Sequence, residues 1–337
     1  MDTIHDLSLQ AIRWLQAEYT HLAAFLRIVS HLGRFEFYLA VVPLIYWCVH
    51  KALGKELAYV LAVANAVLLV AKQAIRGPRP FWLDESLALS NESGFGAPSG
   101  HVQIATVIYL YVAAVVRQRR VWLLAFLAIG LMGFSRVFLG MHFVHDALAG
   151  FLVGVLILFA CWAWRANFHK QFGNRILGQR LLVVVLVPLF FLGLYIGLMT
   201  FLNTVPLEVA WDGHASAAQT DTREDMTAAL GILLGLGVGF ILEASRVHFM
   251  VAGSIPRRIL RYLFGMLVTL AIWRGLDMVF PQDPVWLGLP LRLLRYLLAG
   301  LWVAYYGPYL FVRLGLADAS PEPDVQLTIS DKRFMRP

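Results

Sequence analysis

Charged residues are scarce in this chain of 337 residues, because only 15% are Asp, Glu, Lys or Arg while 59% are hydrophobic. Soluble domains carry about 25% charged and about 45–50% apolar residues, so the composition excludes an ordinary soluble domain. The mean hydropathy of +0.68 agrees. Cysteine is also rare: Cys48 and Cys161 both lie in apolar runs without metal-ligand spacing, which predicts inert core thiols. The N-terminus lacks a basic stretch before an apolar run, so we expect no cleaved signal peptide.

Long apolar runs dominate what is present. A bilayer-spanning helix needs roughly 20 apolar residues, and nine segments approach this length: 36–50, 57–74, 101–117, 120–138, 147–165, 181–202, 227–245, 262–280 and 291–313. Pro43 in the first and shortest segment predicts a kink there. The sequence therefore predicts an all-α, polytopic transmembrane helical bundle of about nine spans.

Residues 8–30 have a different pattern. Apolar side chains recur there at spacings of three and four: Ile12, Leu15, Tyr19, Leu22, Leu26 and Val29. This pattern predicts an N-terminal amphipathic helix, which either lies in the membrane interface or packs on the bundle as a lid. We divide the chain into an amphipathic segment (1–35), a catalytic membrane core (36–165), four further transmembrane helices (166–316) and a cytoplasmic tail (317–337).

Basic residues indicate how the spans are oriented. They gather in alternate loops: Lys51, Lys55, Arg117, Arg119, Arg120, Arg165, Lys170, Arg175, Arg180, Arg246, Arg257, Arg258 and Arg261. The loop at 203–226 is instead acidic, with Glu208, Asp212, Asp221, Glu224 and Asp225. By the positive-inside rule the basic loops are cytoplasmic and the N-terminus is outside. The loops between them hold only Arg76, Arg79 and Arg223, and Arg292 and Arg295 at the last span oppose the trend. Because the net charge of +7 belongs to these loops, we expect no nucleic-acid partner.

Three polar clusters fall at the predicted outer ends of spans: KQAIRGPRP at 72–80, PSGHVQ at 98–103 and SRVFLGMHFVHD at 135–146. Charged groups at membrane depth are costly and are functional candidates by default. Snorkelling to the headgroups explains any single cation. It does not explain two histidines and an aspartate at the same level, so we interpret the clusters as one site.

The cations and the PSGH segment fit a phosphoryl group. Lys72, Arg79 and Arg136 match its charged oxygens. Ser99 and Gly100 precede a helix, so their N–H groups would point at an anion. We interpret the acidic residues of the intervening loop as solvated and predict no metal or other cofactor; these residues are Asp84, Glu85 and Glu92.

The histidines supply chemistry for phosphoryl transfer. His142 and Asp146 are four residues apart and share a face if the segment is helical. The carboxylate would then fix the imidazole tautomer and raise the nucleophilicity of the other nitrogen. His101 can protonate the leaving oxygen and later activate water. His145 is a competing candidate whose spacing fits less well, and we expect it to support the site or face the headgroups.

Together the clusters resemble the three-part signature of the type 2 phosphatidic acid phosphatase and vanadium haloperoxidase superfamily. All three parts match in order and spacing, over residues 72–146, and the membrane scaffold extends the likeness to 36–165. The resemblance implies a phosphohistidine on His142 oriented by Asp146, and His101 as general acid. It also implies a set of phosphate ligands: Lys72, Arg79, Ser99, Gly100 and Arg136.

The chain is also similar to the glucose-6-phosphatases. Nine spans, an external N-terminus, and the stretches HDLSLQAIRWLQ, RPFW and HFVHDALAG carry this likeness. Asp146 departs from it, because the glucose-6-phosphatases have an amide there, whereas the lipid phosphatases of the superfamily have a carboxylate.

We therefore expect a metal-independent phosphatase of a lipid phosphate or polyprenyl diphosphate, since a site at the membrane surface meets headgroups directly. A phosphatase of a soluble phosphate ester and a phosphotransferase to a lipid acceptor are the alternatives. A transporter or channel with a vestigial anion site is disfavoured, because every motif residue is present.

The expected partners are a phosphorylated lipid or other phosphate ester and the membrane lipids; a homo-oligomer is left open. We expect a bacterial inner membrane with the active site on the periplasmic side, or a lumen-facing site in the endoplasmic reticulum if the protein is eukaryotic.

Overall fold

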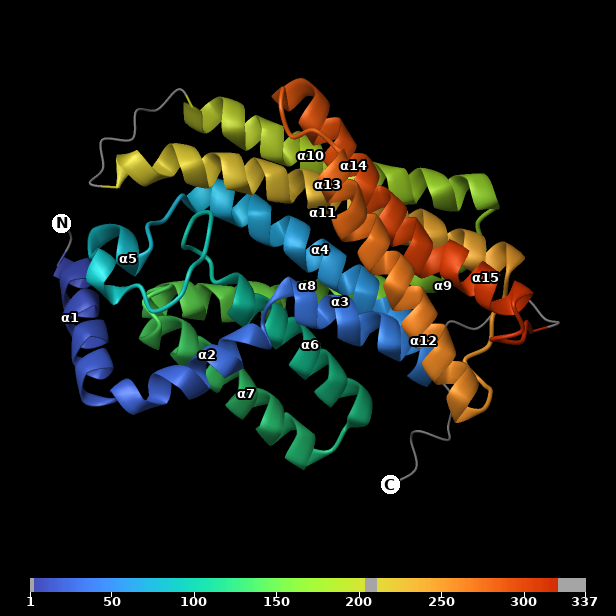
Figure 1. Cartoon of the computed structure of the whole chain (residues 1–337), viewed down its shortest axis with the longest axis horizontal. Coiled ribbons are helices and arrows are strands. Elements are labelled where there is room, and N and C mark those ends of the chain that lie inside the picture. Colours follow the sequence, from blue (N-terminus) through green and yellow to red (C-terminus); the bar gives the residue numbers. More distant parts are fainter. Residues whose placement is uncertain (1–2, 204–210, 321–337) are drawn as a thin grey trace. The chain divides into compact units, whose positions relative to one another are not determined.

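The described part of the chain is helical throughout. The computed structural model describes residues 3–203 and 211–320, and within them the only β pairing is one isolated bridge between Phe249 and Ala319. The longer helices are α1 (Thr3–Glu18), α2 (Ala23–His31), α3 (Phe35–Leu44), α4 (Lys51–Ile75), α6 (Gly100–Val116), α7 (Arg119–Phe138), α8 (Val144–Asn167), α10 (Leu177–Asn203), α11 (Asp212–Arg246), α12 (Ile255–Leu270) and α14 (Val285–Leu301) (Figure 1). The shorter ones are α5 (Pro80–Leu83), α9 (His169–Gly173), α13 (Leu276–Val279) and α15 (Gly307–Arg313), with 3-10 turns at Thr20–Leu22 and Glu85–Leu87 and π-helical turns at Ile45–Val49, Ala271–Gly275 and Trp302–Tyr306. The all-α prediction is confirmed.

Each of the nine predicted spans has a helical counterpart. In the described ranges seven helices are long and apolar enough to cross a bilayer. An eighth candidate is a pair bent by 48°, made of Thr20–His31 and Phe35–Val49. The ninth counterpart is the shorter apolar helix α6, of 17 residues. The bend precedes Pro43, and α3 continues through that proline before it widens into the π-helical turn.

Two compact units divide these helices. Of the described residues, 3–37, 64–162, 193–203 and 211–223 belong to the first unit, and 38–63, 163–192 and 224–320 belong to the second. The second unit contains buried ion pairs of its own: the Glu243 carboxylate pairs with Lys51 at 2.8 Å and with Lys55. Arg292 and Arg295, which oppose the charge trend of the loops, are paired as well, with Glu224 at 2.7 Å and with Asp277 respectively. Of the predicted acidic loop and tail, Glu208 and residues 321–337 lie outside the described residues.

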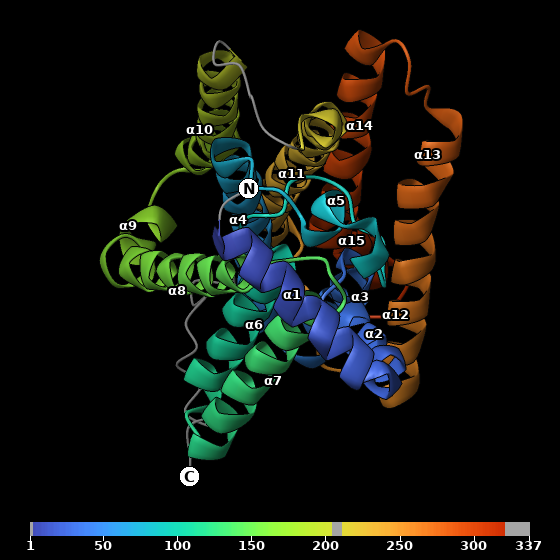
Figure 2. The same cartoon turned by 90° about the vertical axis from the view of Figure 1, so that its left-hand side faces the viewer.

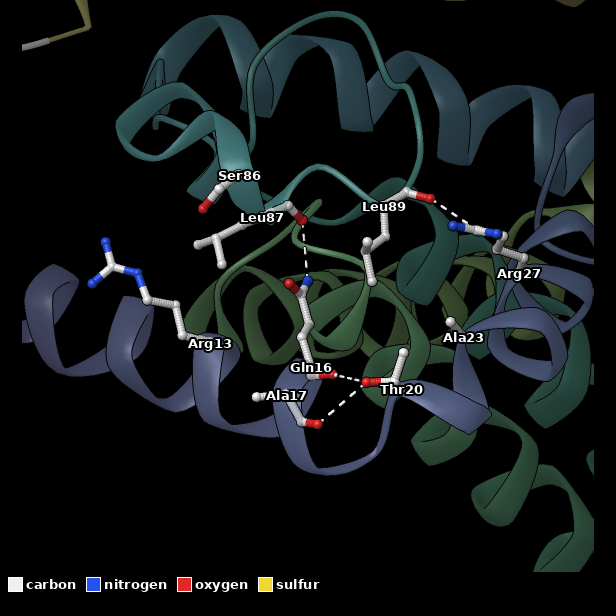
Figure 3. A pocket seen from close by; sticks show the side chains of 9 residues that line it. All are labelled: Arg13, Gln16, Ala17, Thr20, Ala23, Arg27, Ser86, Leu87 and Leu89. Atoms are coloured by element: carbon white, nitrogen blue, oxygen red, sulfur yellow. Dashed lines mark hydrogen bonds between the residues drawn. The ribbon is translucent and has the colours of Figure 1, made fainter.

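The predicted N-terminal amphipathic helix is two helices, because α1 ends at Glu18 and α2 begins at Ala23 (Figure 2). Leu9 and Ile12 of α1 pack into a buried cluster around Phe143, and Leu26 of α2 packs into a second cluster around Met141. The Gln16 side-chain amide donates to the carbonyls of Leu87 at 3.0 Å and Phe138 at 2.7 Å, beside an open groove between α1 and the 86–89 loop (Figure 3). The segment therefore packs on the bundle, as the lid interpretation requires.

The helix ends of the first unit meet through very close backbone contacts. A Cβ on Gly150 of α8 would lie 2.5 Å from the Ser99 carbonyl oxygen, and one on Gly154 would lie 2.8 Å from the Thr106 Cβ. Small residues four apart let two helix backbones approach in a membrane. The pair therefore brings the N-terminus of α6 against the first turns of α8.

This contact generates a stability prediction. We expect Gly150→Ala to destabilise the protein by about 1–3 kcal/mol, because its methyl group meets backbone that cannot move aside locally. Gly130→Ala on α7 is the matched control, since no heavy atom lies within 4 Å of its added Cβ; it should be neutral or slightly stabilising. Thermal unfolding in detergent measures both variants. Equal unfolding temperatures for the two would contradict the packing argument.

Candidate active site

The ends of four helices carry most of the predicted site residues, while Arg79 is the N-cap residue of α5 and His142 lies in the loop between α7 and α8. Lys72 lies in the last turn of α4 and Arg136 in the last turn of α7. Ser99 is the N-cap residue of α6, and Asp146 lies in the first turn of α8. The backbone N–H of Ser99 donates to the carbonyl oxygen of Asp146 at 2.9 Å, which ties the N-termini of α6 and α8 together.

His142 and Asp146 form a buried imidazole–carboxylate pair. Both side chains are almost completely buried, and His142 Nδ1 lies 3.6 Å from Asp146 Oδ2. The same Oδ2 accepts a hydrogen bond from the Phe143 N–H at 2.9 Å, which holds the carboxylate in place. Because Asp146 faces Nδ1, the other ring nitrogen, Nε2, is the one available for a nucleophilic role. Neither ring nitrogen of His142 has a hydrogen-bond partner among the described residues.

His145 competes for the same carboxylate from a different environment. Its Nε2 lies 3.3 Å from Asp146 Oδ1, but its side chain is 50% exposed. The ring stacks on Phe143, with centroids 5.2 Å apart. His145 thus contacts the carboxylate from a half-exposed position, and its expected role, to support the site or to face the headgroups, stays a prediction.

His101 is paired with the carboxylate of Glu92, which the sequence predicts to be solvated. Its Nδ1 lies 3.6 Å from Oε1 of Glu92. Glu92 also pairs with Arg136 through Oε2, and its Oε1 lies 3.8 Å from Arg79 Nη2. The interpretation of Glu92 as a solvated loop residue is therefore wrong: the two arginines and the histidine converge on its carboxylate. Asp84 is likewise not simply solvated, because it pairs with Arg13 at 2.6 Å.

Nothing in the sequence distinguishes Glu92 from its acidic neighbours in the loop. Its loop also contains Gly94 and Gly96, and the Gly96 N–H donates to the Gly77 carbonyl at 2.9 Å, which folds the loop back on the end of α4. The glycines are the one sequence feature that hints at a tight loop. Only the folded backbone then shows which acidic side chain reaches the arginines.

The three cations are nearly inaccessible to solvent. The exposed fractions of Lys72, Arg79 and Arg136 are 8%, 0% and 2%. Lys72 reaches the loop after α5, since a Cβ on Gly94 would lie 3.9 Å from its Nζ. This much buried positive charge requires anionic or carbonyl partners.

Burial and the neighbouring cations together set the protonation state of His142. Burial lowers the pKa of His142 well below its ordinary value of 6.5, and the positive charges of Arg79, Arg136 and Lys72 lower it further. At neutral pH the imidazole is therefore uncharged, which is the form that can act as a nucleophile.

Several buried polar atoms of the site have no hydrogen-bond partner within residues 3–203 and 211–320: Ser99 Oγ, His101 Nε2, both nitrogens of His142, and Arg136 Nε. The Ser99 hydroxyl does not cap its own helix, so it is available to a ligand. Gly100 lies against Leu68, whose Cδ2 would be 2.7 Å from an added Cβ. Unpartnered N–H and O–H donors beside cations at a helix N-terminus fit an oxyanion.

In the part of the chain that the structure describes, no three histidine, cysteine or acidic side chains come together as a metal site. The expectation that the protein works without a metal cofactor stays a prediction.

Two family models and several known phosphatases are similar to this chain. Residues 54–170 match the model of the PAP2 superfamily, and residues 227–319 match the model of the PAP2 superfamily phosphatase transmembrane extension. The chain is 26% identical to glucose-6-phosphatase catalytic subunit 1 of Mus musculus over 85% of this chain and 88% of that protein. It is 30% identical to lipid phosphate phosphatase delta of Arabidopsis thaliana over 41% of this chain and 37% of that protein. A solved PAP2-type phosphatidylglycerolphosphate phosphatase of Bacillus subtilis covers 50% of this chain and 89% of its own, at 24% identity and a TM-score of 0.43.

The helical bundle, the two family-model matches and the similarity to the curated phosphatases define a multi-pass membrane phosphatase. The chain belongs to the membrane-embedded branch of the PAP2 superfamily and carries that superfamily's transmembrane extension.

The lowered pKa of His142 predicts how stability depends on pH. In the unfolded chain His142 takes up a proton near pH 6.5, whereas the folded protein keeps it unprotonated. As the pH falls through 6.5, the unfolded state therefore binds a proton at His142 that the folded state does not bind. The free energy of unfolding is unaffected by this residue above pH 6.5 and decreases because of it below pH 6.5. We expect the unfolding temperature of the wild type to fall more steeply between about pH 7 and about pH 5.5 than that of His142→Asn. Parallel pH profiles would contradict this assignment.

Proposed function

We propose that the protein hydrolyses a phosphate ester through a phosphohistidine on His142, without a metal ion. The supporting observation is the convergence of Arg79, Arg136 and His101 on a single carboxylate, that of Glu92. Guanidinium and imidazole groups that surround the two oxygens of one carboxylate can also surround the oxygens of a phosphoryl group.

In the first step, Nε2 of His142 attacks phosphorus, and the bond from phosphorus to the leaving oxygen breaks. His101 donates its Nε2 proton to that oxygen, since Glu92 faces its Nδ1. Lys72, Arg79 and Arg136, with Ser99 and the backbone N–H of Gly100, bind the phosphoryl oxygens and stabilise the charge that builds up in the transition state.

In the second step, His101 accepts a proton from water. The resulting hydroxide attacks phosphorus, the phosphorus–nitrogen bond breaks, and inorganic phosphate leaves. Asp146 keeps His142 in the tautomer with an unprotonated Nε2 and stabilises the positive charge that the ring acquires. The histidine–carboxylate pairs thus divide the work between nucleophile and acid–base catalyst.

The first substrate class that we propose is a lipid phosphate or polyprenyl diphosphate. Lys72, Arg136 and Asp146 lie in the terminal turns of long apolar helices, and such turns lie at the level of the headgroups. The Asp146 carboxylate is the second supporting feature, because this position distinguishes the lipid phosphatases of the superfamily from the glucose-6-phosphatases.

A soluble phosphate ester is the second candidate. The likeness to mouse glucose-6-phosphatase catalytic subunit 1 spans 85% of this chain, whereas the likeness to the plant lipid phosphate phosphatase spans 41%. A phosphotransferase to a lipid acceptor would use the same residues, with an acceptor hydroxyl in place of water.

We further propose that the site faces the periplasm of a bacterial inner membrane. We also propose that residues 1–35, 36–165, 166–316 and 317–337 are separate functional regions of the chain.

One experiment tests substrate, metal dependence and sidedness. Purified protein in vesicles of known orientation is given phosphatidate, phosphatidylglycerol phosphate, undecaprenyl diphosphate and glucose 6-phosphate, and phosphate release is measured. We expect the lipids to be hydrolysed faster than the sugar phosphate, vanadate to inhibit, and EDTA to have no effect. Added glucose 6-phosphate should be hydrolysed, if at all, only in vesicles with the external face outward. Activity lost to EDTA and restored by magnesium would refute the mechanism, and a preference for glucose 6-phosphate would select the second candidate.

The roles of the two histidines predict different failures. His142→Ala should abolish activity on every substrate and leave no base-stable phosphoenzyme in reactions quenched with alkali, in which a phosphohistidine survives. His101→Ala should slow an alkyl phosphate by about 10²–10⁴-fold, because an alkoxide leaves poorly without a proton. An aryl phosphate should be slowed less in the first step, since a phenolate leaves unaided.

The control is His145→Ala, which should retain phosphoenzyme formation. If it loses the phosphoenzyme while His142→Ala keeps it, the nucleophile is His145 instead.

A further inference from the structure

The orientation of Arg79 depends on the loop that it contacts. Its Nε donates to the carbonyl of Gly94 at 2.7 Å, and its Nη2 donates to those of Ser93 at 2.7 Å and Phe95 at 3.1 Å. Nη1 donates to the carbonyl of Met141 at 3.1 Å. The guanidinium is fully buried, so its plane is fixed by these carbonyls.

Helix α11 holds this loop from the other side. The N–H of Gly94 donates to Oδ2 of Asp221 at 3.2 Å. Gly94 has a positive φ of 71°, a conformation that suits glycine. Phe95 packs against Ala215 and Ala218 of the same helix in a buried cluster. Asp221 is thus the polar attachment between α11 and the loop that orients Arg79.

Helix α2 holds Arg136 in a similar way. Nη1 of Arg136 donates to Oγ of Ser30 at 2.5 Å, and Ser30 is only 3% exposed. The segment after α2 also abuts the acid–base histidine, because a Cβ on Gly33 would lie 2.5 Å from Cδ2 of His101. Among the described residues, Glu92 and Ser30 are the two side chains that pair with or accept from the Arg136 guanidinium.

We propose that Ser30 and Asp221 are positioning residues for the phosphate-binding site, one for each arginine. Ser30 sets the guanidinium of Arg136, and Asp221 sets that of Arg79 through the loop at 93–95. Both lie outside the family models, which match residues 54–170 and 227–319. This inference rests on the proposed function, and it places the N-terminal segment and the start of α11 in the substrate-binding machinery.

The test measures oxyanion affinity in the purified full-length protein. Orthovanadate binding is measured by calorimetry, and KM and kcat are measured with p-nitrophenyl phosphate. A hydrogen bond to a charged group contributes about ten-fold or more to an equilibrium constant. We expect Ser30→Ala and Asp221→Ala each to weaken vanadate binding about ten-fold and to raise KM more than they lower kcat. The double variant should lose about a hundred-fold, since each residue acts on a different arginine.

Conservative variants separate positioning from folding. Ser30→Thr and Asp221→Asn retain an oxygen that accepts the hydrogen bond, so they should restore vanadate affinity to within about three-fold of the wild type. Thr20→Ala and Asp225→Ala remove comparable polar groups at exposed positions of the same two segments, and they should leave affinity unchanged.

Two outcomes would overturn the inference: alanine variants that bind vanadate as the wild type does, or conservative variants that bind as weakly as the alanines. A wild type that binds no vanadate would instead refute the proposed function, and the inference would fall with it.

Discussion

The burial of three cations at one end of four helices is the constraint on which the rest of the site depends. Lys72, Arg79 and Arg136 are at most 8% exposed, and isolated charges in such surroundings are strongly unfavourable. Each arginine must therefore be satisfied by the protein. Four backbone carbonyls accept from Arg79, while Glu92 and Ser30 contact Arg136. These requirements fix the path of the loop between α5 and α6.

The same positive field governs the chemistry. Burial and this field together keep His142 uncharged. The two carboxylates then have different surroundings: Asp146 accepts from a backbone N–H beside His142, whereas Glu92 lies between His101 and Arg136. Perturbed titratable groups collected in this way are typical of catalytic sites.

Outside the candidate active site, charged side chains of the apolar helices form ion pairs with one another. Glu243 forms ion pairs with both Lys51 and Lys55 within the second unit, and Asp277 pairs with Arg295. These pairs explain charged residues within apolar helices without a catalytic role, because a paired charge costs less to bury than an isolated one. The cluster at the candidate active site differs in that several of its donors have no hydrogen-bond partner in the described chain.

The sequence alone determined the helical class, the nine apolar runs, and the order and spacing of the polar clusters, because span length and short-range spacing are local properties. Only the tertiary structure decided that Glu92 contacts the arginines, that residues 8–30 form two helices, and that Ser30 and Asp221 support the cluster. Ser30 is 106 residues from Arg136, and Asp221 is 127 residues from Gly94. No local pattern marks such contacts, since they arise only when helix packing brings distant turns within hydrogen-bond reach.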